Sequence, residues 1–346
     1  MKKLIAMLLS VCMLLSLAAC GAAQQPASTT AAAEPQETEI QATETQATQP
    51  QAVSVNVMVL NGTTGFGMAN LMDAAANGEA ALDYHFTVET DASNIVASLV
   101  NGSADIAALP TNAAAAVYNK TQGGVQVLAL NTLGVLYLVT DGSVEINSMA
   151  DLAGKTVYAP AQNPTFIFQN IVQANGLTDV TIDNTYAQPA DLNTAVASGQ
   201  VSIAVLPEPM VTVAKAQNPN LVVALDLTEQ WEKVCTPGSL VQGCVVVRKE
   251  FVEANPEAVA VFLEEYGASI EAMQADVQGT AAKIEANGIF AKGAVAAKAI
   301  PNCNVCFITG TAMKDALSEF MNIMFAVAPA SVGGAVPSED FYCILN

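Results

Sequence analysis

Positively charged and aromatic side chains are scarce in this sequence. It contains one arginine (Arg248), one histidine (His85) and one tryptophan, and its formal net charge is −20. So acidic a chain is unsuited to bind nucleic acid or an anionic bilayer by charge attraction, and we predict no nucleic-acid partner. Arginine is also the usual bidentate clamp for phosphate, sulfonate or carboxylate. An anionic ligand would therefore have to rely on helix N-termini and backbone N–H groups.

An apolar run long enough to span a bilayer is also missing. The run Leu4–Leu17 follows two lysines and has fourteen residues, whereas a spanning helix needs about 20. This order of basic, apolar and small residues is typical of a secretory signal peptide. Its end, Leu17-Ala18-Ala19-Cys20, resembles the lipobox of bacterial lipoproteins, in which the cysteine sulfur is diacylated and the chain is cut just before it.

We therefore predict a lipoprotein signal peptide over residues 1–20, cleaved before Cys20. A lipid on Cys20 would anchor the protein to the outer side of the cell membrane. An ordinary cleaved signal with an incidental cysteine is the alternative. Residues 21–52 consist mainly of Ala, Gln, Thr, Glu and Pro, a composition that buries too little surface to fold, and we predict a disordered tether there.

Cysteine spacing gives a weak metal signal. Cys303 and Cys306 have the spacing of a metal or redox pair, but a tetrahedral zinc site needs two further ligands and His85 is distant in the sequence. We favour buried or incidentally paired cysteines over a functional site, and we predict no metal and no cofactor. The cysteines after Cys20 are Cys235, Cys244, Cys303, Cys306 and Cys343.

From Val53 onward, short β-branched runs alternate with Ala-rich stretches, which predicts βαβ units and a largely parallel sheet. The segment Asn101–Asn112 also aligns with Ser198–Pro209 at an offset of 97 residues, with Gly, Ile, Ala, Leu and Pro matching. Two copies indicate two similar α/β lobes rather than a solenoid.

Two strand-like runs, 134–140 and 243–247, are predicted as crossings between the lobes. The predicted fold class is α/β, with two Rossmann-like lobes and a double interlobe crossing. The first lobe would comprise residues 53–140 and 243–346, and the second residues 141–242. After the second crossing, helices are predicted over 256–275, 279–286 and 310–327.

Three stretches match motifs of one known family. They are Ile146–Val157 (INSMADLAGKTV), Val196–Ala204 (VASGQVSIA) and Phe251–Val259 (FVEANPEAV). They resemble the patterns I-x-S-x-x-D-L-x-G-K-x-V, L-x-x-G-x-V-D-A-A and F-x-x-x-N-P-E-A-V of the SsuA/THI5-like (NMT1-like) solute-binding proteins, with Ser202 where aspartate is common. The resemblance covers essentially all of residues 53–346.

The resemblance implies a type II periplasmic-binding fold and an extracytoplasmic solute-binding lipoprotein of an ABC importer. A sulfonate, taurine, a thiamine-pyrimidine or a similar nitrogen-containing molecule would bind between the lobes and pass to the permease and ATPase subunits. We predict a monomer without catalytic residues. One alternative is an enzyme on the same fold, of the pyrimidine-synthase or menaquinone-pathway type. Another is a sensory or adhesion lipoprotein without a ligand cleft.

The first candidate ligand loop follows the predicted strand at 53–60. It includes Asn61, Thr64, Gly65 and Phe66, and its glycine would let backbone N–H groups approach a ligand beside a helix N-terminus. A plain tight turn is the alternative for the loop, and core packing is the alternative for the Phe66 ring.

Residues at the ends of the two repeated segments, after Pro110 and Pro207, are the next candidates. Thr111 and Asn112 can bind ligand or simply cap a helix. Glu208 can complement a helix dipole, or it can accept an amine or ring N–H from the ligand. The remaining candidates are uncharged hydrogen-bonding residues near the crossings and the second-lobe helix: Thr132, Gln162, Asn163, Thr165 and Gln242.

Overall fold

The computed structural model describes residues 53–345. The predicted signal peptide over residues 1–20, the lipid on Cys20 and the tether over residues 21–52 lie outside the described residues. Across 53–345, no helix is both long enough and apolar enough to cross a membrane.

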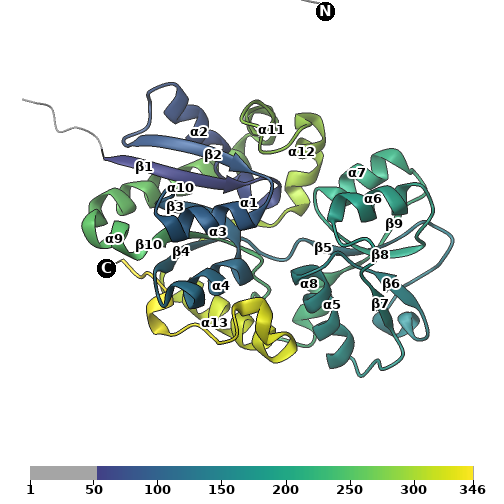
Figure 1. Ribbon diagram of the computed structural model, residues 1–346. Helices are drawn as coiled ribbons and strands as arrows, with labels where there is room; N and C mark the ends of the chain where they lie inside the picture. Colours follow the sequence, from purple (N-terminus) through teal and green to yellow (C-terminus); the bar gives the residue numbers. More distant parts are fainter. Residues whose placement is uncertain (1–52, 346) are drawn as a thin grey trace, which may run out of the picture. The chain divides into compact units, whose positions relative to one another are not determined.

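Six strands form the first sheet, in the order β11-β4-β10-β3-β1-β2 (Figure 1). β2 and β3 run parallel to β1, whereas β10 runs antiparallel to β3 and β4. Consecutive residues of β1, such as Val57, Met58 and Val59, are buried, as expected of a parallel strand covered on both faces. The strands are β1 (Ser54–Leu60), β2 (Asp83–Glu89), β3 (Ile106–Pro110), β4 (Val125–Thr132), β10 (Gly243–Arg248) and β11 (Val305–Ile308).

Five strands form the second sheet, in the order β7-β6-β8-β5-β9. β6 runs parallel to β7 and β8, and β5 runs antiparallel to β8 and β9. β8 therefore occupies the same place in its sheet as β3 does in the first, and these two strands are the two copies of the sequence repeat. The strands are β5 (Leu136–Thr140), β6 (Thr156–Tyr158), β7 (Thr181–Asp183), β8 (Ile203–Pro207) and β9 (Val222–Asp226).

The first crossing between the lobes does not lie at the predicted boundary between them. Sequence patterning predicts residues 53–140 in the first lobe, whereas β5 pairs with β8 and β9 in the second sheet. β5 fills the antiparallel position beside β8 that β10 fills beside β3. The chain crosses between the lobes twice, but the predicted runs 134–140 and 243–247 lie largely in β5 and β10, so the crossings precede Leu136 and Gly243. A strand-like run has the same alternation in either sheet, so its pattern alone does not select the partner.

Helices cover both faces of the first sheet (Figure 1). Side chains of α2, α10, α11 and α12 pack in one core cluster with one face of the sheet, and those of α3, α4 and α13 pack in another cluster with the opposite face. The first-lobe helices are α1 (Thr63–Phe66), α2 (Ala69–Ala76), α3 (Ala92–Asn101), α4 (Thr111–Thr121), α9 (Lys249–Ala254), α10 (Pro256–Ala275), α11 (Val277–Ala286), α12 (Gly293–Ala299) and α13 (Gly310–Val327), with the 3₁₀ turns η2 (Ile300–Asn302), η3 (Pro329–Val332) and η4 (Glu339–Phe341).

The second lobe has its own helices. They are η1 (Met149–Leu152, a 3₁₀ turn), α5 (Asn163–Ala174), α6 (Pro189–Ala197), α7 (Met210–Gln217) and α8 (Leu227–Glu232). α5 to α7 each begin after a strand of the second sheet, as α1 and α4 do in the first. Because helices that follow parallel strands begin at the carboxyl edge of the sheet, this edge of each lobe gathers loops and helix starts.

The predicted helix at 256–275 shows why local patterning succeeds in the C-terminal part. α10 spans these same residues and begins with Pro256, which suits the first turn of a helix because its missing N–H has no partner there. Its buried residues include Phe262, Tyr266, Ile270 and Met273, at spacings of three and four. These spacings place one apolar stripe on the core side of the helix.

Candidate functional site

A cavity of about 410 Å³ lies between loops of the two lobes. We call it the interlobe cleft. The first lobe contributes Asn61 after β1, Thr132 at the end of β4, and Gln242 just before β10. The second lobe contributes Asn163 at the start of α5 and Glu208 after β8. The cleft therefore lies at the carboxyl ends of strands, the usual ligand position in open α/β sheets.

Six of the predicted site residues line the interlobe cleft. They come from five separate loops, and all but one have uncharged side chains. These residues are Asn61, Thr64, Thr132, Asn163, Glu208 and Gln242. The sequence repeat and the crossings thus bring together hydrogen-bonding groups that are far apart along the chain.

The other six predicted residues do not line the cleft: Gly65, Phe66, Thr111, Asn112, Gln162 and Thr165. Gly65 is needed for packing, because an added Cβ there would collide with the carbonyl oxygen of Leu60. The Phe66 side chain is fully buried. The hydroxyls of Thr111 and Thr165 donate to backbone carbonyls, those of Val241 (2.8 Å) and Pro160 (2.7 Å).

Direct hydrogen bonds join the two lobes, and join the two crossings, at the cleft. The Thr63 hydroxyl, from the first lobe, donates to the backbone carbonyl of Glu208 in the second, at 2.8 Å. The Gln242 side-chain oxygen accepts from the backbone N–H of Val135 at 2.8 Å, beside the first crossing. This bond fixes the orientation of the Gln242 side-chain amide group. Its nitrogen can then donate to an acceptor in the cleft.

Asn163 has an unsatisfied polar atom in the cleft. Its side chain is 7 % exposed, and its buried Oδ1 has no hydrogen-bond partner among the described residues. A buried acceptor without a partner costs about 1–3 kcal/mol, which a ligand N–H would recover.

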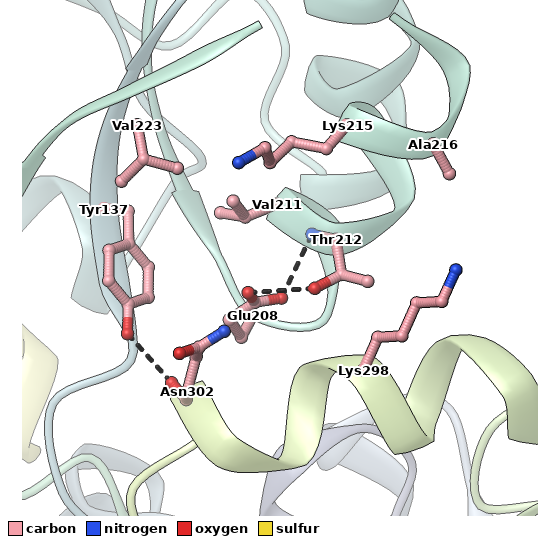
Figure 2. A pocket seen from close by; sticks show the side chains of 9 residues that line it. All are labelled: Tyr137, Glu208, Val211, Thr212, Lys215, Ala216, Val223, Lys298 and Asn302. Atoms are coloured by element: carbon pink, nitrogen blue, oxygen red, sulfur yellow. Dashed lines mark hydrogen bonds between the residues drawn. The ribbon is translucent and has the colours of Figure 1, made fainter. Parts of the chain in front are cut away.

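The Glu208 carboxylate is occupied by the helix that follows it. One oxygen accepts from the Thr212 hydroxyl at 3.0 Å and the other from the Thr212 backbone N–H at 3.1 Å. Figure 2 shows the carboxylate turned toward Thr212 in α7, within a second cavity beside the cleft. This geometry, at the N-terminus of α7, matches the alternative in which Glu208 complements a helix dipole. Burial raises the pKa of the Glu208 carboxyl, and the bonds from Thr212 oppose that rise.

No basic side chain is among the described residues that line the cleft. The single arginine, Arg248, instead forms an ion pair with Asp105 at 2.9 Å and donates from Nε to the carbonyl of Ala104. The cleft itself therefore offers uncharged donors and acceptors. This composition suits a solute without strong net negative charge.

The described cysteines are all free thiols: Cys235, Cys244, Cys303, Cys306 and Cys343. Cys303 and Cys306 do not form a disulfide, and the Cys306 thiol lies 3.7 Å from the carbonyl oxygen of Leu130. Within 53–345, no group of three or more His, Cys, Asp or Glu side chains is placed to hold a metal ion.

Several cleft residues escape sequence-based prediction. They are Thr63, Thr90, Val135, Gln188, Met210 and Phe290. Thr63 and Met210 adjoin predicted residues, so widening each loop by one or two positions would have included them. Phe290 follows α11 and is distant in the sequence from every predicted site loop. In the folded protein, the centre of its ring lies 6.2 Å from that of Phe66. No local signal marks it, because only tertiary packing brings it to the cleft.

Comparisons with known proteins agree with this architecture. The family model described as NMT1/THI5 like matches residues 78–279. A structure of an ABC transporter from Parabacteroides distasonis is 22% identical, with a TM-score of 0.72, and the alignment covers 84% of this chain and 99% of that chain. The periplasmic aliphatic sulphonate binding protein SsuA from Escherichia coli is 13% identical, with a TM-score of 0.67 and coverage of 84% and 96%.

A third structure extends the likeness to a eukaryote. The Candida albicans CA3427 product, described as having the generic periplasmic binding protein structural fold, is 11% identical, with a TM-score of 0.53 and coverage of 80% and 95%. A comparison with curated protein sequences finds no match. At these identities the structural likenesses establish the fold, and the predicted two-lobed periplasmic-binding fold is confirmed.

Proposed function

This chain belongs to the NMT1/THI5-like family, and from that premise we propose that it is the extracytoplasmic solute-binding protein of an ABC importer. It captures a small organic solute between its lobes and delivers it to the permease. The observation that carries the proposal is the interlobe cleft of about 410 Å³, which residues of both lobes line. A cavity of this size suits a small molecule. Closure of the lobes around a solute would signal loading to the permease.

The polar groups of the cleft favour a neutral or nitrogen-bearing solute over a sulfonate. None of the described lining residues is basic, whereas the buried Oδ1 of Asn163 needs a donor. A sulfonate has acceptors only and would leave that oxygen unsatisfied. A ring or chain with N–H donors and no net negative charge, such as a thiamine-type pyrimidine, satisfies it. Taurine falls between the two classes, because its ammonium donates while its sulfonate lacks a cationic partner.

A thermal-shift screen tests both the function and the ligand class. Bound ligand raises the free energy of unfolding by RT ln(1 + [L]/Kd), about 2.7 kcal/mol at one hundred times Kd, or a shift of several degrees. We expect aminopyrimidines and other neutral N–H compounds to stabilise the protein, and alkanesulfonates to have little effect. Stabilisation by sulfonates alone would refute the ligand class. The absence of any stabilising solute would refute the binding function.

The enzyme alternative predicts turnover. Glu208 is the sole acidic residue among the described residues that line the cleft, and its carboxylate already accepts two bonds from Thr212. General acid–base catalysis usually relies on more than one positioned titratable group, and Glu208 has no second titratable side chain beside it in the described lining. A stabilising compound should therefore be recovered unchanged after long incubation with the protein. Conversion of that compound to a product would replace the binding function with an enzymatic one.

The anchor is part of the proposal. A lipid on Cys20 and the tether over residues 21–52 would keep a monomeric capture protein beside its permease and ATPase subunits. Replacing Cys20 with alanine should move the protein from the membrane fraction to the soluble fraction of expressing cells, with the same solute affinity. Retention of the Cys20→Ala protein in the membrane fraction would contradict lipid anchoring at this residue.

A further inference from the structure

A second cavity, of about 440 Å³, lies beside the interlobe cleft and shares only Glu208 with it. In the second lobe it is lined by β5, α7 and β9, including Tyr137 and Thr212. In the first lobe it is lined by Lys298 of α12 and Asn302 of η2. The cavity therefore has walls from both lobes, like the cleft, but it contains a different set of chemical groups.

Two lysines face this cavity from opposite lobes. Lys215 lines it from α7 and Lys298 from α12, and Figure 2 shows their ammonium groups in separate places, that of Lys215 toward Val223 and that of Lys298 below Ala216. Both residues are exposed. The ion pairs of the described chain all involve other residues, but Lys215 lies close enough to Glu208 that its charge lowers the pKa of that carboxyl. Either ammonium group can attract an anion that enters the cavity.

An acidic group lies at the base of the same cavity. Glu208 is 4 % exposed, and each of its carboxylate oxygens accepts one bond from Thr212. A carboxylate has about four acceptor sites, so it can accept further donors. The Tyr137 hydroxyl donates to the carbonyl of Asn302 at 2.9 Å, and its oxygen lone pairs are available to another donor. Val211 and Val223 add apolar side chains to the lining of the cavity.

We propose that this cavity is a second ligand site, for a small zwitterion that carries an amine and a carboxylate or similar anion. The anionic end pairs with Lys215 or Lys298, and the ammonium end donates to Glu208. The apolar side chains accommodate a short methylene chain between the two ends. The cleft and this cavity thus select different ligands, because the described lining of the cleft has no cation.

Titration calorimetry on the full-length protein in detergent tests the site with defined probes. β-Alanine, γ-aminobutyrate and ε-aminocaproate vary the distance between the two charges, while butyrate and butylamine each carry one charge of γ-aminobutyrate. At least one amino acid should bind with one-to-one stoichiometry, about tenfold or more tighter than either single-charge probe. Added salt should weaken it, because both lysines are exposed. Equal affinity for amino acid, butyrate and butylamine, or no binding of any amino acid, overturns the proposal.

Matched variants locate the probe. The Lys215→Gln/Lys298→Gln double variant should lose about tenfold or more in probe affinity. The Lys120→Gln/Lys155→Gln variant changes the net charge equally at lysines outside the cavity and should bind the probe as the parent does. Equal losses in both double variants would show that only net charge matters and would refute the site.

Two further substitutions separate the cavity from the cleft. Glu208→Gln keeps the side-chain volume but removes its charge, so the amino acid should then bind no better than butyrate. Asn163→Ala alters the cleft alone and should leave probe affinity unchanged. Loss of probe binding in Asn163→Ala would place the probe in the cleft and refute a second site, while leaving the proposed transport function intact.

Discussion

Asn163 allows the cleft to be tested by two measurements with opposite expected results. Its Oδ1 is buried without a partner among the described residues, at the first position of α5. Replacing Asn163 with alanine removes this unsatisfied acceptor, which costs about 1–3 kcal/mol. Alanine also has the higher helix propensity. We therefore expect the free energy of unfolding of the ligand-free protein to stay the same or to rise, despite the loss of side-chain contacts.

Ligand binding should change in the other direction. A solute that donates an N–H to Oδ1 loses this bond in Asn163→Ala, at a cost of about 1–3 kcal/mol, which corresponds to about a 5- to 150-fold weaker Kd. Urea unfolding of the free protein gives the stability change, and calorimetry with the most stabilising solute from the thermal-shift screen gives the affinity change. A variant that is less stable yet binds the solute normally would refute the role of Asn163.

Asn193 provides the matched control. It lies on α6 in the same lobe, is 4 % exposed, and also has a buried Oδ1 without a partner in the described chain. It does not line the cleft. Asn193→Ala should therefore give the same kind of stability change with unaltered solute affinity. If both variants weaken binding equally, the effect comes from general changes in the second lobe and not from a contact with the solute.

Three further predictions follow from burial and packing. Burial raises the pKa of the Glu208 carboxyl in the folded state, so the folded protein holds this proton more strongly, and its stability falls as pH rises from the ordinary carboxyl pKa through the raised one. Urea unfolding across this pH range should show that the stability advantage of Glu208→Gln over the parent grows as pH rises; a constant difference would contradict this. Burial also raises the pKa of the Cys244 and Cys303 thiols, so a thiol reagent at mildly alkaline pH should label both only after unfolding, and rapid native labelling would refute their burial. Gly65→Ala should lower the free energy of unfolding by about 1–3 kcal/mol or more, because its Cβ would collide with the Leu60 carbonyl oxygen; unchanged urea unfolding would disprove the close approach.

The elements that sequence patterning predicts well are those specified by neighbouring residues. α10 and α13 span the predicted ranges 256–275 and 310–327, because their apolar spacings and end signals are local. β3 and β8 match as repeat copies for the same reason. β5 was the exception, since its alternating pattern fits either sheet and only pairing decides between them.

For the candidate site, too, the sequence predicts some features and not others. The rule that ligands bind at the carboxyl ends of strands identified six cleft residues. Side-chain direction was not predictable, because a residue after a strand can turn toward the cleft, the core or the next helix. Glu208 turns toward Thr212, and Thr111 donates to the carbonyl of Val241. These directions depend on partners that are distant in sequence.

By itself, the sequence determined the acidic charge, the lipobox-like pattern near Cys20, the duplicated α/β pattern and the family motifs, because each depends on composition or on residues close together in the chain. The tertiary structure decided which sheet β5 joins, that Phe290 reaches the cleft, and that Lys215 and Lys298 face one cavity from different lobes. These features arise from contacts between segments far apart in the chain. The free energy of such contacts comes from packing and hydrogen bonding that no local pattern encodes.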